Sequence, residues 1–156
     1  MQNKEKGFSL IELLIVVAII LIIAAIAIPN LLRSKMATNE SSAVSALRTI
    51  NTASVAYSTT YGQYPGTLAS LGPVAFPPPN STTADLIDSV LATGIKSGYN
   101  ITYSGTVASG IVGSYTITAS PVTQGVSGQR GFFTDQSGVI RADPAGSATA
   151  SSTPLS

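Results

Sequence analysis

The hydrophobic pattern of the chain begins with an apolar run near its N-terminus. From Leu13 to Ile28 every residue is apolar. With the apolar residues on either side, the run reaches the ~20 residues that a helix needs to span a bilayer. A helix that is apolar on every face belongs in lipid or inside a protein assembly. The sequence therefore predicts a helix whose first half has no aqueous side.

The helical pattern then continues but becomes one-sided. Between Leu31 and Tyr61, one stripe of residues recurs at spacings of four and three, as in an amphipathic helix: Ala43, Leu47, Ile50, Ser54, Tyr57 and Tyr61. Gly62 and Pro65 follow as stop signals. We expect one helix over residues 8–61, with residues 8–29 as its transmembrane or filament-core part.

The remaining residues, 62–156, predict a globular head that starts with a long αβ-loop. The Pro-rich stretch 76–80 is typical of a stiff, extended backbone. Thr82 stands three residues before Asp85, a pattern that favours a capped helix start. A short helix is expected to follow and to end at Gly94.

Past this short helix the hydrophobic period changes to two, which is typical of β-strands. Residues 99–103 and 115–119 each predict a strand. Residues 131–134 and 139–141 flank a four-residue turn ending in glycine and predict a hairpin. The small, polar tail 144–156 is expected to be flexible or laid on the surface. The predicted fold is α+β, with the long helix packed on a small sheet of three or four antiparallel strands.

One carboxylate, Glu12, stands just inside the start of the apolar run. A charged side chain deep in hydrocarbon costs roughly 2.5–3.5 kcal/mol on insertion scales, so an acid there points to a function. Two ordinary explanations of the run are disfavoured by this acid. One is a secretory signal peptide with Lys4 and Lys6 as its basic flank and a cleavage site at Ala25–Ala27. The other is a plain single-span anchor, in which Glu12 snorkels to the interface.

A third explanation comes from a resemblance. Residues 6–20 closely resemble the class III signal sequence of type IV pilin precursors of the type IVa kind. The shared motif is a short charged leader ending in Gly7, the aromatic Phe8, Glu12 five residues into the mature chain, and Pro29 at the far end of the apolar run.

This resemblance implies specific roles for four residues. A prepilin peptidase would cut between Gly7 and Phe8, discard the leader 1–7 and N-methylate Phe8. Glu12 would set the axial register of assembly by pairing with the new amine of an adjacent subunit. Pro29, which lacks an N–H, would kink or open the helix locally.

The resemblance also implies a structural, non-catalytic subunit that polymerises with itself as a helical homopolymer. Its partners would be the prepilin peptidase, the pilus assembly platform and its ATPase. The precursor would lie in the inner membrane and the mature chain in an extracellular pilus on the cell surface. Adhesion or motility are the roles that such filaments imply, and no cofactor or metal is expected.

Composition limits the other possibilities. Only 10% of the 156 residues are charged and the net charge is +1, so nothing indicates a dedicated nucleic-acid site. The sequence has no cysteine and no histidine, which excludes a thiol nucleophile, a Ser-His-Asp triad and a disulfide framework. Many type IVa pilins have a C-terminal disulfide, and this cysteine-free chain departs from that pattern.

Two alternative functions stay open. A major pseudopilin of a type II secretion system shares the N-terminal motif, but such proteins carry an acid-rich calcium loop near the C-terminus. The head's four acids, Asp85, Asp88, Asp135 and Asp143, do not form such a cluster. From another class, the chain would be a membrane-anchored or secreted binding module.

Overall fold

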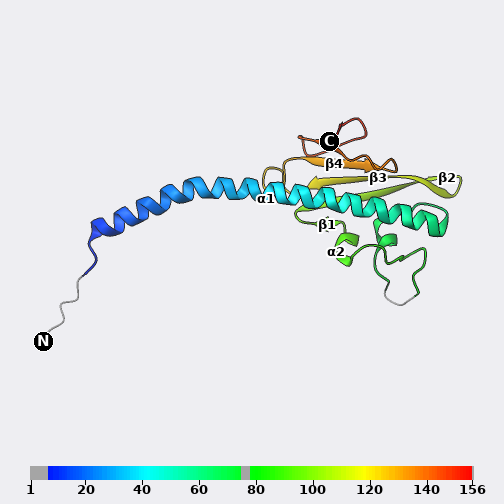
Figure 1. Ribbon diagram of the computed structural model, residues 1–156, viewed down its shortest axis with the longest axis horizontal. Helices are drawn as coiled ribbons and strands as arrows, with labels where there is room; N and C mark the ends of the chain where they lie inside the picture. The colour runs from blue at the N-terminus through cyan, green and yellow to red at the C-terminus, as the bar shows by residue number, and fades with distance from the viewer. Residues whose placement is uncertain (1–6, 75–77, 156) are drawn as a thin grey trace. The chain divides into compact units, whose positions relative to one another are not determined.

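The computed structural model describes residues 7–74 and 78–155, and it confirms the α+β prediction. Apart from Gly7, the predicted leader lies outside the described residues, as do residues 76 and 77 of the Pro-rich stretch. One helix, α1 (Leu10–Tyr61), is followed by a six-stranded antiparallel sheet (Figure 1). The chain forms two compact units, the N-terminal one up to Ser34 and the head unit from Lys35 onward.

The sheet is a simple meander in which each strand pairs with the next one along the chain. Ser109 and Gly110 both have positive φ, 53° and 82°, and join the two longest strands in a tight turn. Two successive positive φ values are typical of a type I′ hairpin, whose twist matches that of the strands. The strands are β1 (Ile95–Lys96), β2 (Tyr99–Ala108), β3 (Ile111–Pro121), β4 (Gly131–Asp135), β5 (Arg141–Asp143) and β6 (Thr153–Pro154).

The second half of α1 supplies the centre of the head's core. The predicted stripe is buried at every position except Tyr61, which is partly buried. It packs against inward-facing residues of the strands: Tyr99, Ile101, Tyr115, Ile117, Ala119 and Phe132. Asn51 adds a polar bridge, donating from Nδ2 to Thr134 Oγ1 (2.9 Å) and accepting from the Tyr115 hydroxyl (3.1 Å).

The predicted start of the short helix is wrong. Helix α2 (Ser89–Ala92) is capped by Asp88, whose Oδ1 accepts from Leu91 N at 2.8 Å. Asp85 instead has a φ of 55°, outside the helical region. The cause is tertiary, because Ala84 and its successors hydrogen-bond to the backbone of residues 70–72, next to a short 3₁₀ helix, η1 (Leu68–Leu71). A local capping pattern cannot compete with these bonds.

The predicted four-residue turn forms at residues 135–138, where Gly138 N donates to Asp135 O (3.0 Å), but it does not close a tight hairpin. Phe133 is the last residue of β4 to pair with β5, opposite Arg141, and residues 136–140 connect the two strands. The end of β4 continues to pair with β3 instead, through Thr116 and Asp135. Asp135 Oδ1 accepts from Ser137 N (2.9 Å), a local bond typical of loops that begin with Asp.

The tail forms regular structure, against part of the expectation. Strand β6 pairs with β5, Leu155 N donates to Ile140 O (2.8 Å), and Ala148 is buried. The sheet therefore has more strands than expected. Both β1 and β6 are two residues long, which is too short to show a period of two in the sequence.

We predict that Leu47→Ala destabilises the head by about 2–5 kcal/mol, because Leu47 is fully buried and its truncation leaves a cavity. Urea unfolding of the detergent-solubilised chain measures this. Val55→Ala on the same helix is the control, since Val55 is 52% exposed, and its effect should stay within about 0.5 kcal/mol. Equal losses from both variants would contradict the placement of the core.

Candidate functional site

The N-terminal segment begins with three residues that precede the helix. Residues 7–9 are not helical, and α1 starts at Leu10. Glu12 folds back on this start, since its Oε2 accepts a hydrogen bond from Ser9 N at 2.9 Å. Glu12 thereby satisfies a backbone donor that has no partner within the helix. Its other carboxylate oxygen makes no hydrogen bond to the residues that the structure describes.

This contact is half of a capping box, in which a Ser at the N-cap is followed three residues later by Glu. The sequence reasoning gave Glu12 a role between subunits and missed this role within the chain. The signal was present, because Ser9-Leu10-Ile11-Glu12 fits the pattern directly before the apolar run. A carboxylate in the first turn is also favoured by the helix dipole.

Gly7 and Phe8 do not pack against the rest of the described chain. A Cβ built on Gly7 would meet no atom within 4 Å, so packing within the chain gives no reason for a glycine there. The Phe8 side chain is 78% exposed. Both residues are open to another molecule, and neither is needed for the fold of the described residues.

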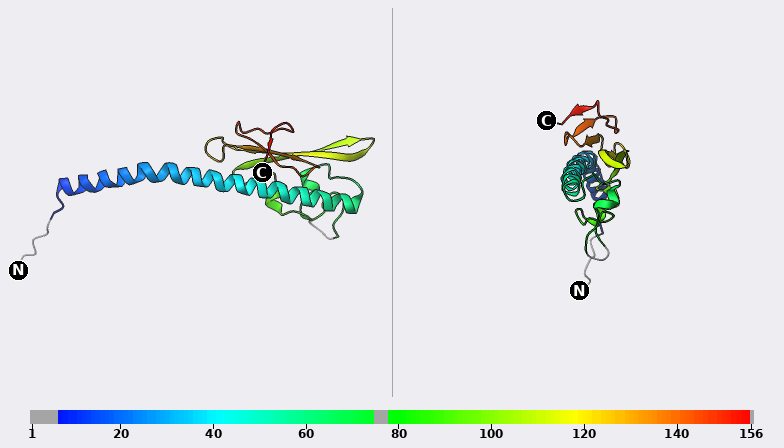
Figure 2. Two further views of the ribbon diagram at one scale, coloured as in Figure 1. Left: turned by 45° about the horizontal axis from the view of Figure 1, so that its top comes forward. Right: turned by 90° about the vertical axis from the view of Figure 1, so that its right-hand side faces the viewer.

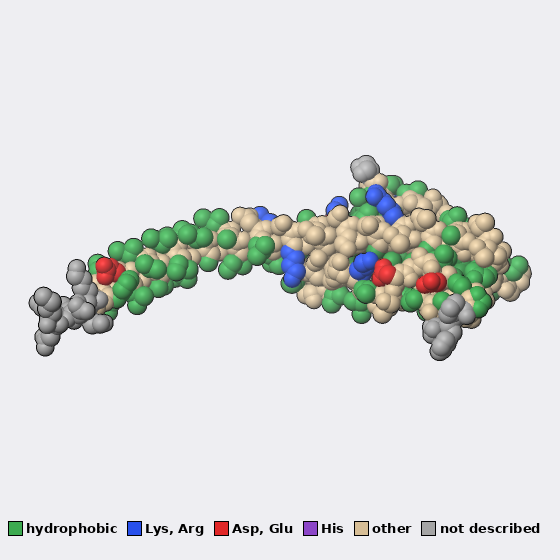
Figure 3. Space-filling view, turned by 60° about the horizontal axis from the view of Figure 1, so that its bottom comes forward, with side chains coloured by type: hydrophobic (Ala, Val, Ile, Leu, Met, Phe, Trp, Pro, Cys, Tyr) green, Lys and Arg blue, Asp and Glu red, His purple; other side chains and the backbone are tan. Residues whose placement is uncertain are grey.

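The first half of α1 exposes its apolar side chains on all sides. The large hydrophobic residues from Leu10 to Leu32 are between 38% and 79% exposed. Figure 3 shows hydrophobic side chains covering this half on the face in view. By length and composition, α1 could cross a membrane, and its most apolar 18-residue window has no residue buried within the described chain. Such a surface requires lipid or other helices.

Helix α1 continues through Pro29. Pro29 has no N–H, so the carbonyl of Ala25 lacks its usual helical donor. The next residue, Asn30, donates from Nδ2 to the carbonyl of Ile26 at 3.0 Å. The side chain of Asn30 therefore hydrogen-bonds the backbone at the turn that the proline weakens, and a kink at Pro29 stays a prediction.

A buried carboxylate, Glu40, ties α1 to the loop before β4 in the head unit. Its Oε1 accepts from the backbone N–H groups of Gln129 (2.9 Å) and Arg130 (3.0 Å), and its Oε2 accepts from Arg130 Nε (2.8 Å). Burial alone would raise the pKa of Glu40, but these bonds and the guanidinium charge outweigh it and hold the pKa below its ordinary value of 4.5. The sequence reasoning missed this contact, because residues so far apart in the chain give no local signal.

At the other end of the head, five tyrosines pack together. The ring centroids of Tyr57 and Tyr61 lie 4.5 Å apart, those of Tyr64 and Tyr115 4.9 Å, and those of Tyr103 and Tyr115 5.3 Å. Burial raises the pKa of Tyr115 to about 12, so its phenol stays neutral. These contacts place Tyr57 and Tyr61 in the packing of the head, as their positions on the apolar stripe predict.

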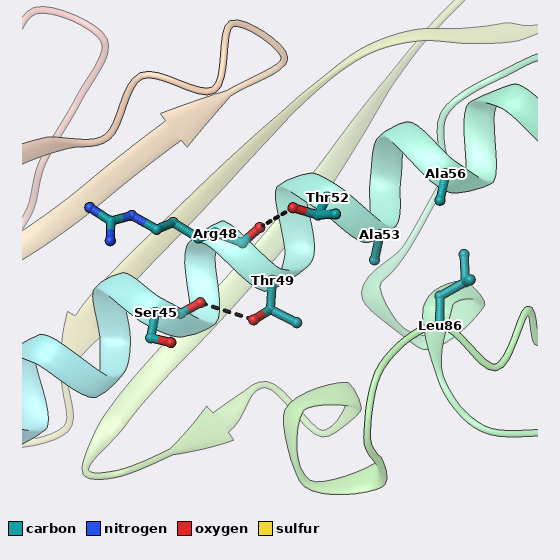
Figure 4. Close-up of a pocket in the computed structure, with 7 residues that line it drawn as sticks. All are labelled: Ser45, Arg48, Thr49, Thr52, Ala53, Ala56 and Leu86. Atoms are coloured by element: carbon teal, nitrogen blue, oxygen red, sulfur yellow. Dashed lines mark hydrogen bonds between the residues drawn. The ribbon is translucent and has the colours of Figure 1, made fainter.

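A groove on the head runs along α1 and has a volume of about 440 Å³ (Figure 4). Two of its hydroxyls are used by the helix itself, since Thr49 Oγ1 donates to Ser45 O and Thr52 Oγ1 to Arg48 O, both at 3.0 Å. The Arg48 side chain points away from the other lining residues. Within the part of the chain that the structure describes, no three acidic side chains gather to hold a metal ion. The groove therefore lacks the converging polar groups of a catalytic site.

Comparison with known proteins identifies the N-terminal segment. Residues 2–28 match the family model described as the prokaryotic N-terminal methylation motif. The chain is 56% identical over 39 residues to the type IV wide pilus major component PilA4 of Thermus thermophilus, which covers 25% of this chain and 30% of that protein. It is 50% identical over 50 residues to the type IV major pilin protein PilA of Myxococcus xanthus, covering 32% and 23% respectively.

A third relative comes from a secretion system. The chain is 29% identical over 72 residues to the type II secretion system core protein G of Dickeya chrysanthemi, covering 46% of this chain and 47% of that protein. No solved structure matches the chain. In each comparison the chain spans less than half of its relative's length. The predicted resemblance is thus confirmed for the N-terminal segment, which carries the prepilin methylation motif and is homologous to type IV pilins.

We predict that the Glu40 contact makes the head acid-sensitive. Because its folded-state pKa is depressed, Glu40 contributes stability that is present above pH 4.5 and is lost as the pH falls through the folded-state pKa. Glu40→Gln should destabilise the head at pH 7 by about 1–3 kcal/mol, since Arg130 loses a charged acceptor. The variant should also lose less stability than the wild type between pH 5 and about pH 3.

The control is Asp88→Asn. Asp88 is exposed and pairs with Lys96 at 3.4 Å, and Asn caps a helix as well as Asp does. At pH 7, Asp88→Asn should lower the free energy of unfolding by less than Glu40→Gln does. Urea unfolding of each variant at each pH measures this. A Glu40→Gln variant with wild-type stability and an unchanged acid profile would contradict the role of this carboxylate.

Proposed function

We propose that this chain is the precursor of a structural subunit of a type IV pilus filament. The proposal rests on one observation: the methylation motif and an exposed apolar helix occupy the same segment of the chain. The segment that matches the methylation motif, residues 2–28, contains the helix half whose apolar side chains are exposed on all sides. A leader sequence alone needs no partner after processing, whereas an apolar helix kept in the mature chain does.

The first step is processing by a prepilin peptidase. It cuts between Gly7 and Phe8, releases residues 1–7 and methylates the new N-terminus at Phe8. The local structure supports this site. Residues 7–9 are non-helical, and a Cβ on Gly7 would meet no neighbouring atom. This segment can therefore enter the narrow active site of the peptidase in extended form without disturbing α1.

The second step is assembly through Glu12. Cleavage creates an amino group on Phe8, and a carboxylate in an apolar environment is tolerated when it is paired with a cation. One oxygen of Glu12 is held by Ser9 N within the chain. The other oxygen is left for the methylated amine of an adjacent copy. This pair sets the axial register, which aliphatic side chains cannot do because they offer no directional contact.

The rest of α1 completes the cycle. The apolar half of the helix rests in the inner membrane before assembly and in the filament core afterwards, so it stays out of water in both places. Pro29 is the point at which this half can bend or open as the helix moves from the inner membrane into the filament core. The assembly platform and its cytoplasmic ATPase are the partners for that transfer, and adhesion or motility are roles of the resulting surface filament.

The runner-up is a major pseudopilin of a type II secretion system, which the similarity to core protein G favours. Such a chain would share the processing and the helix, but its filament would serve secretion. The head acids Asp85, Asp88, Asp135 and Asp143 form no acidic cluster in the described residues, and this favours the pilus. A membrane-anchored or secreted binding module is the alternative from another class, and the first experiment below separates it.

That experiment is the intact mass and N-terminal residue of the protein purified from its native cells. We expect loss of residues 1–7 and one added methyl group on Phe8. Cleavage after Ala27, or a chain with no cleavage, would overturn the pilin proposal. In that case the chain would be an exported or anchored domain.

The second experiment separates the two roles of Glu12. Glu12→Gln keeps an oxygen that can cap Ser9 N but removes the charge, whereas Glu12→Ala removes both. Both variants should remain in the membrane. We expect both to reduce the yield of sheared surface filaments by at least about tenfold, the effect of roughly 1.4 kcal/mol per contact. Normal filaments from Glu12→Gln alone would show that Glu12 acts only as a cap and would overturn the pairing.

A further inference from the structure

One long segment of the head carries no charge at all. From Ser97 to Gln129 the sequence contains no Asp, Glu, Lys or Arg. This segment includes β2, β3 and the loop that follows them. The surface of a soluble domain normally mixes both signs of charge, so an uncharged surface of this extent points to association.

The segment exposes two apolar side chains at the turn between β2 and β3, the end of the hairpin that we call the tip. Val107 is 64% exposed and Ile111 is 54% exposed, and they lie on either side of the tight turn at Ser109 and Gly110. Val107 pairs with Val112 and Ile111 with Ala108, so the two side chains stand on opposite faces of the hairpin and make both faces of its end apolar. The adjacent residue Val112 is tied down, since its carbonyl accepts from Tyr64 N (3.0 Å) and its N–H donates to the Gln63 side chain (3.2 Å). The tip is therefore held in one conformation.

A second apolar patch lies in the loop after β3, which we call the base. Val122 is 54% exposed and Val126 is 53% exposed. The loop is fixed by hydrogen bonds, among them Val126 N to Thr123 O (3.2 Å) and Asn39 Nδ2 to Ser127 O (2.7 Å). Both patches are thus preorganised, which lowers the entropic cost of a contact.

The tip and the base lie at opposite ends of the head unit. The tip contacts residues 63–64, just after α1 ends, whereas the base contacts Asn39 near the start of the head's part of α1. The two patches are joined by the 11 residues of β3, roughly 35 Å at about 3.3 Å per residue. Figures 1 and 2 show the long β2–β3 hairpin running along α1.

The edge of the sheet beside the tip is also unprotected. β1 pairs only with Tyr99 and Asn100, so the outer edge of β2 extends well beyond its partner strand. Natural sheets discourage association at such edges with charged side chains, especially lysine. Lys96 in β1 is a charge on this edge, but residues 101–108 of β2 carry none, so the sequence does not oppose contact between copies beside the tip.

We propose that the tip of one copy packs on the base of the next copy in the filament. This is a contact between the head units of two copies, and it is separate from the contacts between their apolar helices. The proposal rests on the proposed function. A filament of one repeated chain needs two different patches on each copy, because a self-complementary patch closes a dimer and stops growth. The tip and the base are two such surfaces, both uncharged, both with exposed apolar side chains and both tied to the head by hydrogen bonds.

The absence of cysteine allows a direct test in filaments sheared from cells that make the full-length chain. Ile111→Cys and Val126→Cys are introduced together and the filaments are treated with a short bismaleimide. Within one copy the two positions are too far apart to be linked. We expect a ladder of covalent multimers on denaturing gels, and no linked dimer from either single variant.

The control pair is Val55→Cys with Val126→Cys, since Val55 is 52% exposed on α1 and lies outside both patches. It should give no ladder. Linked dimers from Ile111→Cys alone would mean a tip-to-tip contact and would overturn the proposal. So would filaments of the double variant that give no ladder, and in that case the pilus function would stand. A wild-type chain that forms no filaments would overturn both.

Discussion

The burial of one stripe of α1 under the sheet is the contact on which the head depends. Ala43, Leu47 and Ile50 supply the helix side of the core, and inward-facing aromatic residues of β2, β3 and β4 supply the other side. A fully buried side chain of this size contributes about 1.5–3 kcal/mol. The chain has no cysteine to add a cross-link, so every strand is positioned directly or indirectly by this packing.

The first half of the same helix has a different distribution of apolar residues. There the apolar residues surround the whole helix and are exposed in the isolated chain. A single continuous helix thus couples a domain that is stable in water to a segment that is stable only in lipid or against other helices. This change of pattern separates two demands on one helix: the exposed half needs lipid or other helices around it, and the buried half holds the head together.

Two carboxylates of α1 show how one residue type serves different ends. Glu12 begins the helix by accepting a hydrogen bond from Ser9 N through one of its carboxylate oxygens. Glu40 accepts three hydrogen bonds from Gln129 and Arg130 and so joins α1 to the loop before β4. The first carboxylate caps the start of a helix, and the second holds together two segments of the head that are far apart in the chain.

Local pattern was enough to determine the long helix, its change from all-round to one-sided hydrophobicity, part of each of the two long strands and the N-terminal motif. These features are set by neighbours within a few residues, where periodicity and capping act. Tertiary structure decided the start of α2, the register of β4 against β5, the pairing of the tail and the partners of Glu40. Each of these depends on backbone or side-chain groups far apart in the chain, such as Glu40 with Arg130 or residues 84–87 with 70–72. A short sequence window contains only one side of such a contact, so only the folded chain can specify it.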